Sequence, residues 1–351
     1  MLVGQIGSRG VPPSRFAWAV QLNWLDPDHL VDRDVAGAVA LLDAARRVDS
    51  PHELVGPTVF SFTIGLRHGW DGDPPLAAVA RDGKGRVIAV LNVWLPHWDN
   101  TFVGFIHVTV DPLARRQGIG RRLFEKGVER ARADGRSLVL SDCWADSAGV
   151  EFARAMGLEQ ASVFVSRRQD LRALDWPHLD AEYSAAESRA AGYELVRVAG
   201  PVPEDMLADV VTMTAAINDA PTDDLDIEDE VFTPERIRAF EAARLANKDR
   251  TYRVIARESG TGVLAGHSMV GVNAEHPGYG WQYDTSVLRA HRGHRLGRLL
   301  KIDMLRWLAD EEPQLRSIDT GNAASNAHMI EVNEVLGYHV VATGIEWQRH
   351  L

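Results

Sequence analysis

The sequence predicts an α/β (α+β) protein made of two tandem domains, each a sheet flanked by helices. Three observations predict this class. Runs of β-formers alternate with helical stripes along the chain. One stretch, 105–131, reads as a strand, a glycine-bearing loop and a helix. The same order of elements recurs about half a chain later, and 351 residues are enough for two domains.

The first half is predicted to contain three helices between its strands. Apolar or small residues at 120, 123, 124, 127, 128 and 131 trace one helical face. An alanine-rich composition favours a helix at 33–48, and a third helix, 147–156, ends at Gly157. The predicted strands are 16–22, 58–67, 86–95, 102–110, 137–142 and 159–168.

A connector rich in small and polar residues separates the halves. We therefore expect a first domain at 1–172, a linker at 173–190 that is partly helical, and a second domain at 191–351. In the second domain, Thr233 is a suitable N-cap and Pro234 suits the first helical position. The predicted helices there are 204–217, 234–246 and one that follows residue 296, and the predicted strands are 193–198, 252–258, 262–271 and 280–287.

The two halves share a repeated pattern. Three pairs of residues lie 177 positions apart, which indicates an internal duplication. The pairs are Val110 with Val287, Arg115 with Arg292, and Gly120 with Gly297.

The loop between strand and helix is basic and carries glycine. A turn of this kind points several backbone N–H groups at one place, and the helix start adds the positive end of its dipole. The neighbouring arginines strengthen the attraction to phosphate oxygens. The segment lacks a GKS or GKT sequence and a third glycine at the dinucleotide spacing, so neither common phosphate motif is present.

The pattern of Arg115, Gly118 and Gly120 resembles the acyl-CoA loop of the GNAT N-acetyltransferase superfamily. The resemblance implies two largely antiparallel, splayed sheets, acetyl-CoA or another acyl-CoA as co-substrate, and no metal. It also implies residues that bind the pyrophosphate and pantetheine. In the first half these are Val108, Thr109, Val110, Arg115, Arg116, Gln117, Gly118, Ile119, Gly120 and Arg121; in the second they are Thr285, Ser286, Val287, Arg292, Gly293, His294, Arg295, Leu296, Gly297, Arg298, Asn322 and Asn326.

The second loop departs from the motif at Arg295, which replaces the first glycine. If that position needs a positive φ, the side chain costs roughly 1 kcal/mol or more. We nevertheless expect the second loop to bind CoA, because several cationic residues surround it.

Acyl transfer to an amine requires a base that removes a proton. Strand parity puts Ile106 and Gly104 at the family's base positions in the first half, and neither takes a proton. His107 lies on the opposite face, where a packed histidine is the commoner outcome. In the second half the positions hold Tyr283 and Trp281, and a strand bulge would bring in Asp284.

We take Tyr283 and Asp284 as catalytic candidates; the alternative is that Trp281 and Tyr283 form only an aromatic wall. The tyrosine acid of many family members is replaced by Ala153 and by Asn333, and Asn333 is the third catalytic candidate.

The acceptor site is predicted from an acidic segment, 218–230. Asp223, Asp224 and Asp226, with Trp281, are candidates to bind a cationic acceptor, and a solvated acidic loop is the alternative. A net charge of −11 argues against a nucleic-acid partner. No apolar run reaches membrane-spanning length and no signal core begins the chain, which predicts a cytoplasmic location. We expect a monomer or a homodimer.

The function predicted is transfer of an acyl group from acyl-CoA to a primary amine of a small molecule by direct attack, with catalysis in the second half. Two alternatives remain open at this point: a non-catalytic acyl-CoA sensor or scaffold, and a transferase that uses a carrier-protein thioester or an aminoacyl-tRNA.

The single cysteine, Cys143, excludes disulfides within the chain.

Overall fold

The computed structural model of the protein describes residues 21–351. The predicted strand 16–22 lies mostly outside these residues. The first half contains β1 (Gln21–Trp24), α1 (Asp32–Asp49), α2 (Val59–His68), β2 (Leu76–Arg81), β3 (Val87–Trp94), β4 (Val103–Val110), α3 (Ile119–Ala133), β5 (Leu138–Trp144), α4 (Gly149–Ala155) and β6 (Glu159–Asp170).

The second half repeats this succession after a connecting helix. Its elements are α5 (Trp176–Arg189), β7 (Tyr193–Ala199), α6 (Leu207–Thr214), α7 (Pro234–Ala246), β8 (Asp249–Glu258), β9 (Leu264–Asn273), β10 (Tyr279–Val287), α8 (Leu296–Glu311), β11 (Ser317–Ala323), α9 (Ala327–Val335) and β12 (His339–His350). Short 3₁₀ turns, Pro112–Ala114 and Arg289–His291, precede α3 and α8 at equivalent places.

Two predictions about the first half were wrong. The segment 58–67 is not a strand but the helix α2, because Thr58 and Ser61 form a reciprocal capping box that starts it. The strand β2 was missed, since its sequence, LAAVAR, is dominated by alanine and carries a weak β signal. The helix predicted at 33–48 is confirmed by α1. The predicted N-cap at Thr233 is also confirmed, because its side-chain oxygen accepts a hydrogen bond from the Arg236 N–H.

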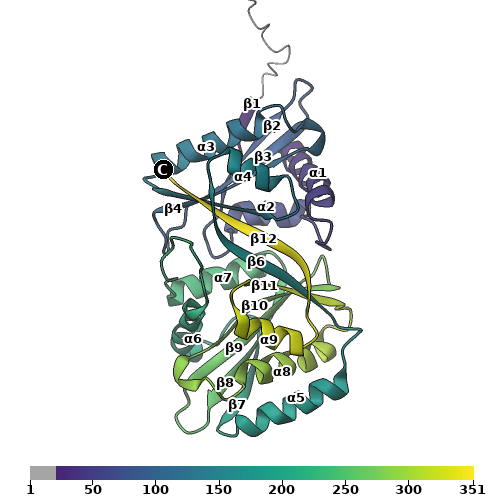
Figure 1. Cartoon of the computed structure of the whole chain (residues 1–351), viewed down its shortest axis with the longest axis vertical. Coiled ribbons are helices and arrows are strands. Elements are labelled where there is room, and N and C mark those ends of the chain that lie inside the picture. Colours follow the sequence, from purple (N-terminus) through teal and green to yellow (C-terminus); the bar gives the residue numbers. More distant parts are fainter. Residues whose placement is uncertain (1–20) are drawn as a thin grey trace, which may run out of the picture.

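The strands of residues 21–351 form one twelve-stranded sheet in which the halves exchange their last strands. The order is β1-β2-β3-β4-β5-β12-β6-β11-β10-β9-β8-β7. Thus β12, from the end of the second half, pairs with β5 of the first, and β6 pairs with β11. Figure 1 shows β12 (yellow) crossing the middle of the molecule to place the C-terminus in the first half. The domain boundaries stay a prediction.

Each half contains a pair of parallel strands that part. In the first, β4 and β5 pair only where Val103–Phe105 faces Leu138–Leu140. In the second, β10 and β11 pair only where Tyr279–Trp281 faces Ser317–Asp319. Beyond these short ladders the strands diverge, which opens the sheet on the side where the glycine-bearing loops lie.

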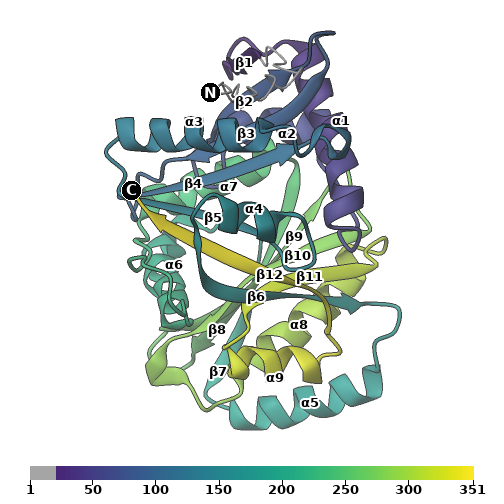
Figure 2. The ribbon, with the colours of Figure 1, turned by 45° about the horizontal axis from the view of Figure 1, so that its top comes forward.

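Two apolar cores hold the helices against the sheet. Leu123, Phe124 and Val128 of α3 are buried against β3 and β4, as the helical stripe predicted. The second core packs α8 on β8 and β9, and α5 adds Leu179 and Ala186 to it. Figure 2 shows α5 beside α8 and α9 at the end of the molecule opposite β1. Among the described residues, no helix combines the length and apolar character needed to cross a bilayer.

Candidate functional site

Each pair of diverging strands opens into a cleft. The first-half cleft, about 650 Å³, is bordered by β4, the loop before α3, the end of β5 and α4. The second-half cleft, about 760 Å³, is bordered by β10, the loop before α8, the end of β11 and α9. The duplication therefore produces two clefts of matching construction, each with a helix N-terminus at its mouth.

The two loops share one backbone conformation, but glycine and arginine have changed places. In the first loop Arg116 (φ 64°) and Gly118 (φ 77°) are left-handed; in the second, Gly293 (φ 87°) and Arg295 (φ 58°) are. These positions are pairwise 177 apart. Each loop thus holds one arginine in a conformation that costs about 1 kcal/mol. Arg295 does adopt the positive φ on which its expected cost depended, and Arg116 carries the same cost in the first loop.

The motif arginines brace the loops. Arg115 donates from Nε to the Val110 carbonyl (3.2 Å) and from Nη1 to Asp49 (2.8 Å). Arg292 donates from Nε to the Val287 carbonyl (3.0 Å) and from Nη2 to Asp219 (2.5 Å). These guanidinium groups are already engaged by carboxylates, so anion binding falls to the backbone amides of the loop and first helical turn.

The loops are open to a ligand. A Cβ added at Gly118, Gly293 or Gly297 would meet no other atom within 4 Å. Most residues predicted to bind CoA line the clefts, but Gln117 and His294 do not, and Arg298 is paired with Glu182 (2.8 Å) and Glu331 (2.7 Å). Ile119 and Leu296 are buried, which leaves only their backbone for a ligand.

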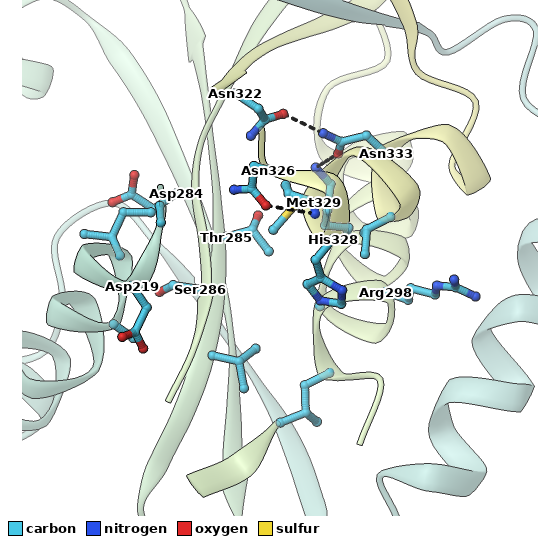
Figure 3. A pocket seen from close by; sticks show the side chains of 18 of the residues that line it. Asp219, Asp284, Thr285, Ser286, Arg298, Asn322, Asn326, His328, Met329 and Asn333 are labelled. Atoms are coloured by element: carbon cyan, nitrogen blue, oxygen red, sulfur yellow. Dashed lines mark hydrogen bonds between the residues drawn. The ribbon is translucent and has the colours of Figure 1, made fainter. Parts of the chain in front are cut away.

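A β-bulge lies in β10, as one reading of the sequence required. Gln282 faces Val270 and Thr285 faces Ser268, so two residues lie opposite one. Asp284 is one of the two. Burial raises the pKa of its carboxyl, and the nearby Arg253 and Arg236 oppose that rise. Figure 3 shows Asp284 on one side of β10 and Asn322, Asn326 and Asn333 on the other.

Tyr283, the other residue of the bulge, packs in an aromatic cluster. Its ring lies 5.4 Å from that of Trp70 and 5.8 Å from that of Phe240. It also covers Gly271, where an added Cβ would come within 2.6 Å of the ring. These contacts favour the aromatic-wall interpretation over a catalytic role. Trp281 is 38% exposed and lines neither cleft.

A buried polar chain in the second half joins α8 to β11. Lys301 donates from Nζ to Oδ1 of Asn333 (2.7 Å), and Asn333 donates from Nδ2 to Oδ1 of Asn322 (2.8 Å). Burial lowers the pKa of Lys301 from 10.5 to about 7. The equivalent first-half residues, Phe124 and Ala153, are apolar. The sequence feature that could have indicated this chain is Lys301 itself, which directly follows the apolar positions Leu299 and Leu300 of the predicted helix.

A histidine–carboxylate pair lies in the first-half cleft. His107 of β4 and Asp142 of β5 meet across the diverging strands, with Nε2 and Oδ1 2.8 Å apart, and both line the cleft. Burial alone would lower the pKa of His107, but the Asp142 carboxylate raises it above its ordinary value. Conversely, although burial would raise the pKa of Asp142, His107 holds it below its usual value. The sequence predicted a packed histidine at position 107 and did not predict its contact with Asp142.

The acidic segment is fastened down rather than free. Asp223 accepts hydrogen bonds from Ser162 (2.9 Å) and Ser325 (2.5 Å). The backbone N–H of Asp226 donates to Gln348 (3.0 Å). Neither Asp223, Asp224 nor Asp226 lines either cleft. Acceptor binding by these three residues stays a prediction. The hydrogen bonds of Asp223 to Ser162 and Ser325 already occupy its carboxylate oxygens. Among residues 21–351 there is no cluster of His, Cys, Asp and Glu suited to a metal ion.

Diverging parallel strands, a left-handed residue at the helix start and a duplicated layout define the class of tandem acyltransferase folds. The comparisons agree. Residues 46–158 match the model of the acetyltransferase (GNAT) family. Residues 46–158 thus form a domain of the GNAT family, whose general chemistry is acyl transfer, and the tandem layout of the whole chain is similar to that of a solved tandem GNAT protein.

Solved structures resemble the chain over nearly its whole length. A tandem GNAT protein from the clavulanic acid biosynthesis pathway is 26% identical, with a TM-score of 0.77, 94% of this chain covered and 98% of that one. A GCN5-related N-acetyltransferase from Sphaerobacter thermophilus is 16% identical (TM-score 0.65, 94% and 95% covered). A glucosamine N-acetyltransferase region of a fungal multi-domain β-N-acetylglucosaminidase is 13% identical (TM-score 0.67, 97% and 39% covered). The last two show the fold alone. No curated protein sequence matches the chain.

Proposed function

We propose that the protein is an acyl-CoA-dependent N-acyltransferase that transfers an acetyl or related acyl group to a primary amine of a small molecule by direct attack. The observation that carries this proposal is the arrangement of the second cleft. Its bulge places the Asp284 carboxyl on one side of β10, and the polar chain that ends at Asn322 lies on the other.

The loop before α8 suits the pyrophosphate of CoA. Its backbone is open at Gly293 and Gly297, and the first-turn amides of a helix have no partner within the helix. Anions are stabilised at such a place by the dipole and by direct N–H donation. Thr285 and Val287, at the end of β10, border the same cleft and are placed to contact the pantetheine arm.

Asp284 is the base in this proposal. An amine must lose a proton to attack the thioester carbonyl, and a partly buried carboxylate with a raised pKa takes that proton more readily than a fully exposed one. Glu230, whose pKa burial raises to about 6 despite the attraction of Arg236, adds a second carboxyl near Asp284. Both favour a cationic amine over an anionic acceptor.

Asn322 is the donor on the other side. Its Oδ1 is occupied by Asn333, so its Nδ2 is left to donate to the carbonyl oxygen of the thioester. Asn333 is itself held by Lys301, and both are buried. We therefore assign Asn333 and Lys301 the task of orienting the Asn322 amide, while Tyr283 forms the aromatic wall.

The test is acetyl transfer by the purified chain to a panel of ethanolamine, putrescine and glucosamine, with CoA release followed by liquid chromatography. Asp284→Asn should lower kcat about 100-fold, the scale of general-base catalysis. Asp310→Asn, at an exposed position of α8, is the matched control. Tight acetyl-CoA binding without turnover on any amine would contradict the proposal and favour a sensor. Absence of acetyl-CoA binding would favour a different donor.

A further inference from the structure

The first-half cleft also contains the elements of a reaction centre. Strand β4 is regular from Phe105 to Val110, so His107 lies on the face opposite Ile106 and Val108, which pack against α3. The His107 ring is fixed on two sides, by Asp142 and by the edge of Trp94, whose ring is 5.0 Å away. Because Nε2 donates to Asp142, Nδ1 is left to accept a proton.

The second half covers this face of the first half. Leu225 and Ile227, from the segment after α6, pack against Val103, Leu138 and Leu140 of β4 and β5. The backbone N–H of Glu228 donates to Asn100 at 2.8 Å. The second half thus covers the apolar residues where β4 and β5 pair, next to the first-half cleft.

A third cavity, about 400 Å³, lies between the two clefts. It shares Asp142 with the first cleft and Asn322 with the second. The exchanged strands β6 and β12 contribute Ser162, Phe164 and Glu346, and Thr222 and Leu225 border it. Glu346 faces Asp142 in register on the neighbouring strand. Two carboxyls beside an aromatic ring suit an amine that carries an apolar portion.

We propose that the first half is a second acyl-transfer centre, in which His107 is the general base and the cavity between the halves binds the amine acceptor. Asp142 is the positioning residue that orients the imidazole. The inference rests on the proposed acyl-transfer function and extends it to a site that both copies of the repeat build together. Burial raises the pKa of Glu346, and the carboxyls of Asp142 and Asp223 add to the rise, so a cation that enters this cavity would relieve the repulsion among these groups.

The step is balanced. The bound ammonium first releases one proton to solvent. The neutral amine nitrogen then attacks the thioester carbon, a C–N bond forms and the C–S bond breaks. His107 takes one proton from the nitrogen at Nδ1 and returns it to the leaving sulfur. The products are an amide and the thiol of CoA, and no oxidant, metal or further reactant is required.

The experiment uses the full chain carrying Asp284→Asn, so that the first half is observed. Acetyl transfer to putrescine and ethanolamine should persist in this protein at the reduced rate, about one-hundredth of the wild-type kcat. Adding His107→Gln should lower the remaining kcat about 100-fold and leave the KM for acetyl-CoA unchanged. Asp142→Asn should lower kcat in the same direction and leave the KM for acetyl-CoA unchanged, while the KM for the amine should rise because Asp142 also borders the amine cavity. A merely structural role would change the KM for acetyl-CoA as well.

The matched control is His97→Gln. His97 also bonds an aspartate, Asp73, in the same half, but it lines none of the three cavities. This variant should leave the remaining transfer unchanged. If His107→Gln fails to fold, as judged by its Tm, Glu346→Gln replaces it and should raise the KM for the amine several-fold.

Three results would overturn the inference: no transfer left after Asp284→Asn, transfer that His107→Gln does not change, or an amine KM that Glu346→Gln does not change. A wild-type chain that transfers nothing would instead contradict the proposed function itself, so the two failures are distinguishable.

Discussion

Gly118 and Arg295 occupy the same place in two copies of one loop, and both adopt the left-handed conformation, with φ of 77° and 58°. The loop shape has therefore been kept although its residues changed. Two positions earlier the exchange is reversed, with Arg116 in the first loop and Gly293 in the second. One left-handed glycine per loop is enough, because the helix start and the hydrogen bonds of Arg115 and Arg292 hold the rest of the loop.

This equivalence predicts opposite effects of two substitutions on stability. Arg295→Gly should raise the free energy of unfolding by up to about 1 kcal/mol, because glycine adopts a positive φ without strain. Gly118→Ala should lower it by about 1 kcal/mol. Gly297→Ala is the control, since Gly297 is helical without a positive φ and a Cβ there meets open space. Urea titration measures all three, and equal stabilities of Arg295→Gly and wild type would contradict the strain.

The raised pKa of Asp284 predicts a pH-dependent cost to stability. The native state holds this proton more tightly than the unfolded state, so the contribution is fully present below the ordinary pKa of 3.8 and is lost as pH rises through the raised value. Asp284→Asn should therefore be more stable than wild type at pH 7, and the difference should shrink toward pH 4. Thermal melts across that range measure it; a constant difference would argue against a buried carboxyl.

Lys301 predicts the opposite slope. Its folded pKa of about 7 lies below the ordinary 10.5, so the unfolded state binds more protons between these values. The unfolding free energy of the wild type should therefore rise with pH over this window. Lys301→Met should lack that rise and be the more stable protein at pH 7. Parallel curves for the two proteins would mean that Lys301 is not buried in its neutral form.

The exchanged strand predicts that both halves unfold together. Trp347 of β12 is buried in the first-half core, at 3% exposure, although it comes from the end of the second half. Trp347→Ala should cost about 3 kcal/mol or more. Hydrogen exchange should show the same loss of protection in β5 and β11. Val340→Ala, exposed on the same strand, is the control. Protection lost in β5 alone would show that the halves are energetically separate.

Sequence reasoning reached the local features and missed those that depend on distant partners. The strand, loop and helix at 105–131 were predicted because periodicity, glycine and charge agree there. The α2 segment was misread because Thr58 and Ser61 start a helix through side-chain contacts that periodicity does not register. Parity placed His107 on the correct face, but its partner Asp142 lies 35 positions away on another strand.

The strand exchange was also beyond local pattern. Both β6 and β12 read as closing strands, and nothing in their own residues specifies which fifth strand each will join. Asp284 depended on a bulge that parity alone could raise only as an alternative. The parts of the site that the sequence did not predict therefore depend on strand pairing between distant segments and on the bulge in β10.

Each half of the sheet contains a strand from the other half: β12 lies next to β5, and β6 lies next to β11. Loss of either copy of the repeat would therefore remove a strand from the sheet of the remaining copy. Divergence was confined to what the interlocked frame tolerates, namely side chains such as Phe124 against Lys301 and Ala153 against Asn333. The two clefts therefore differ through side-chain substitutions, while the exchanged strands keep the two halves joined in one sheet.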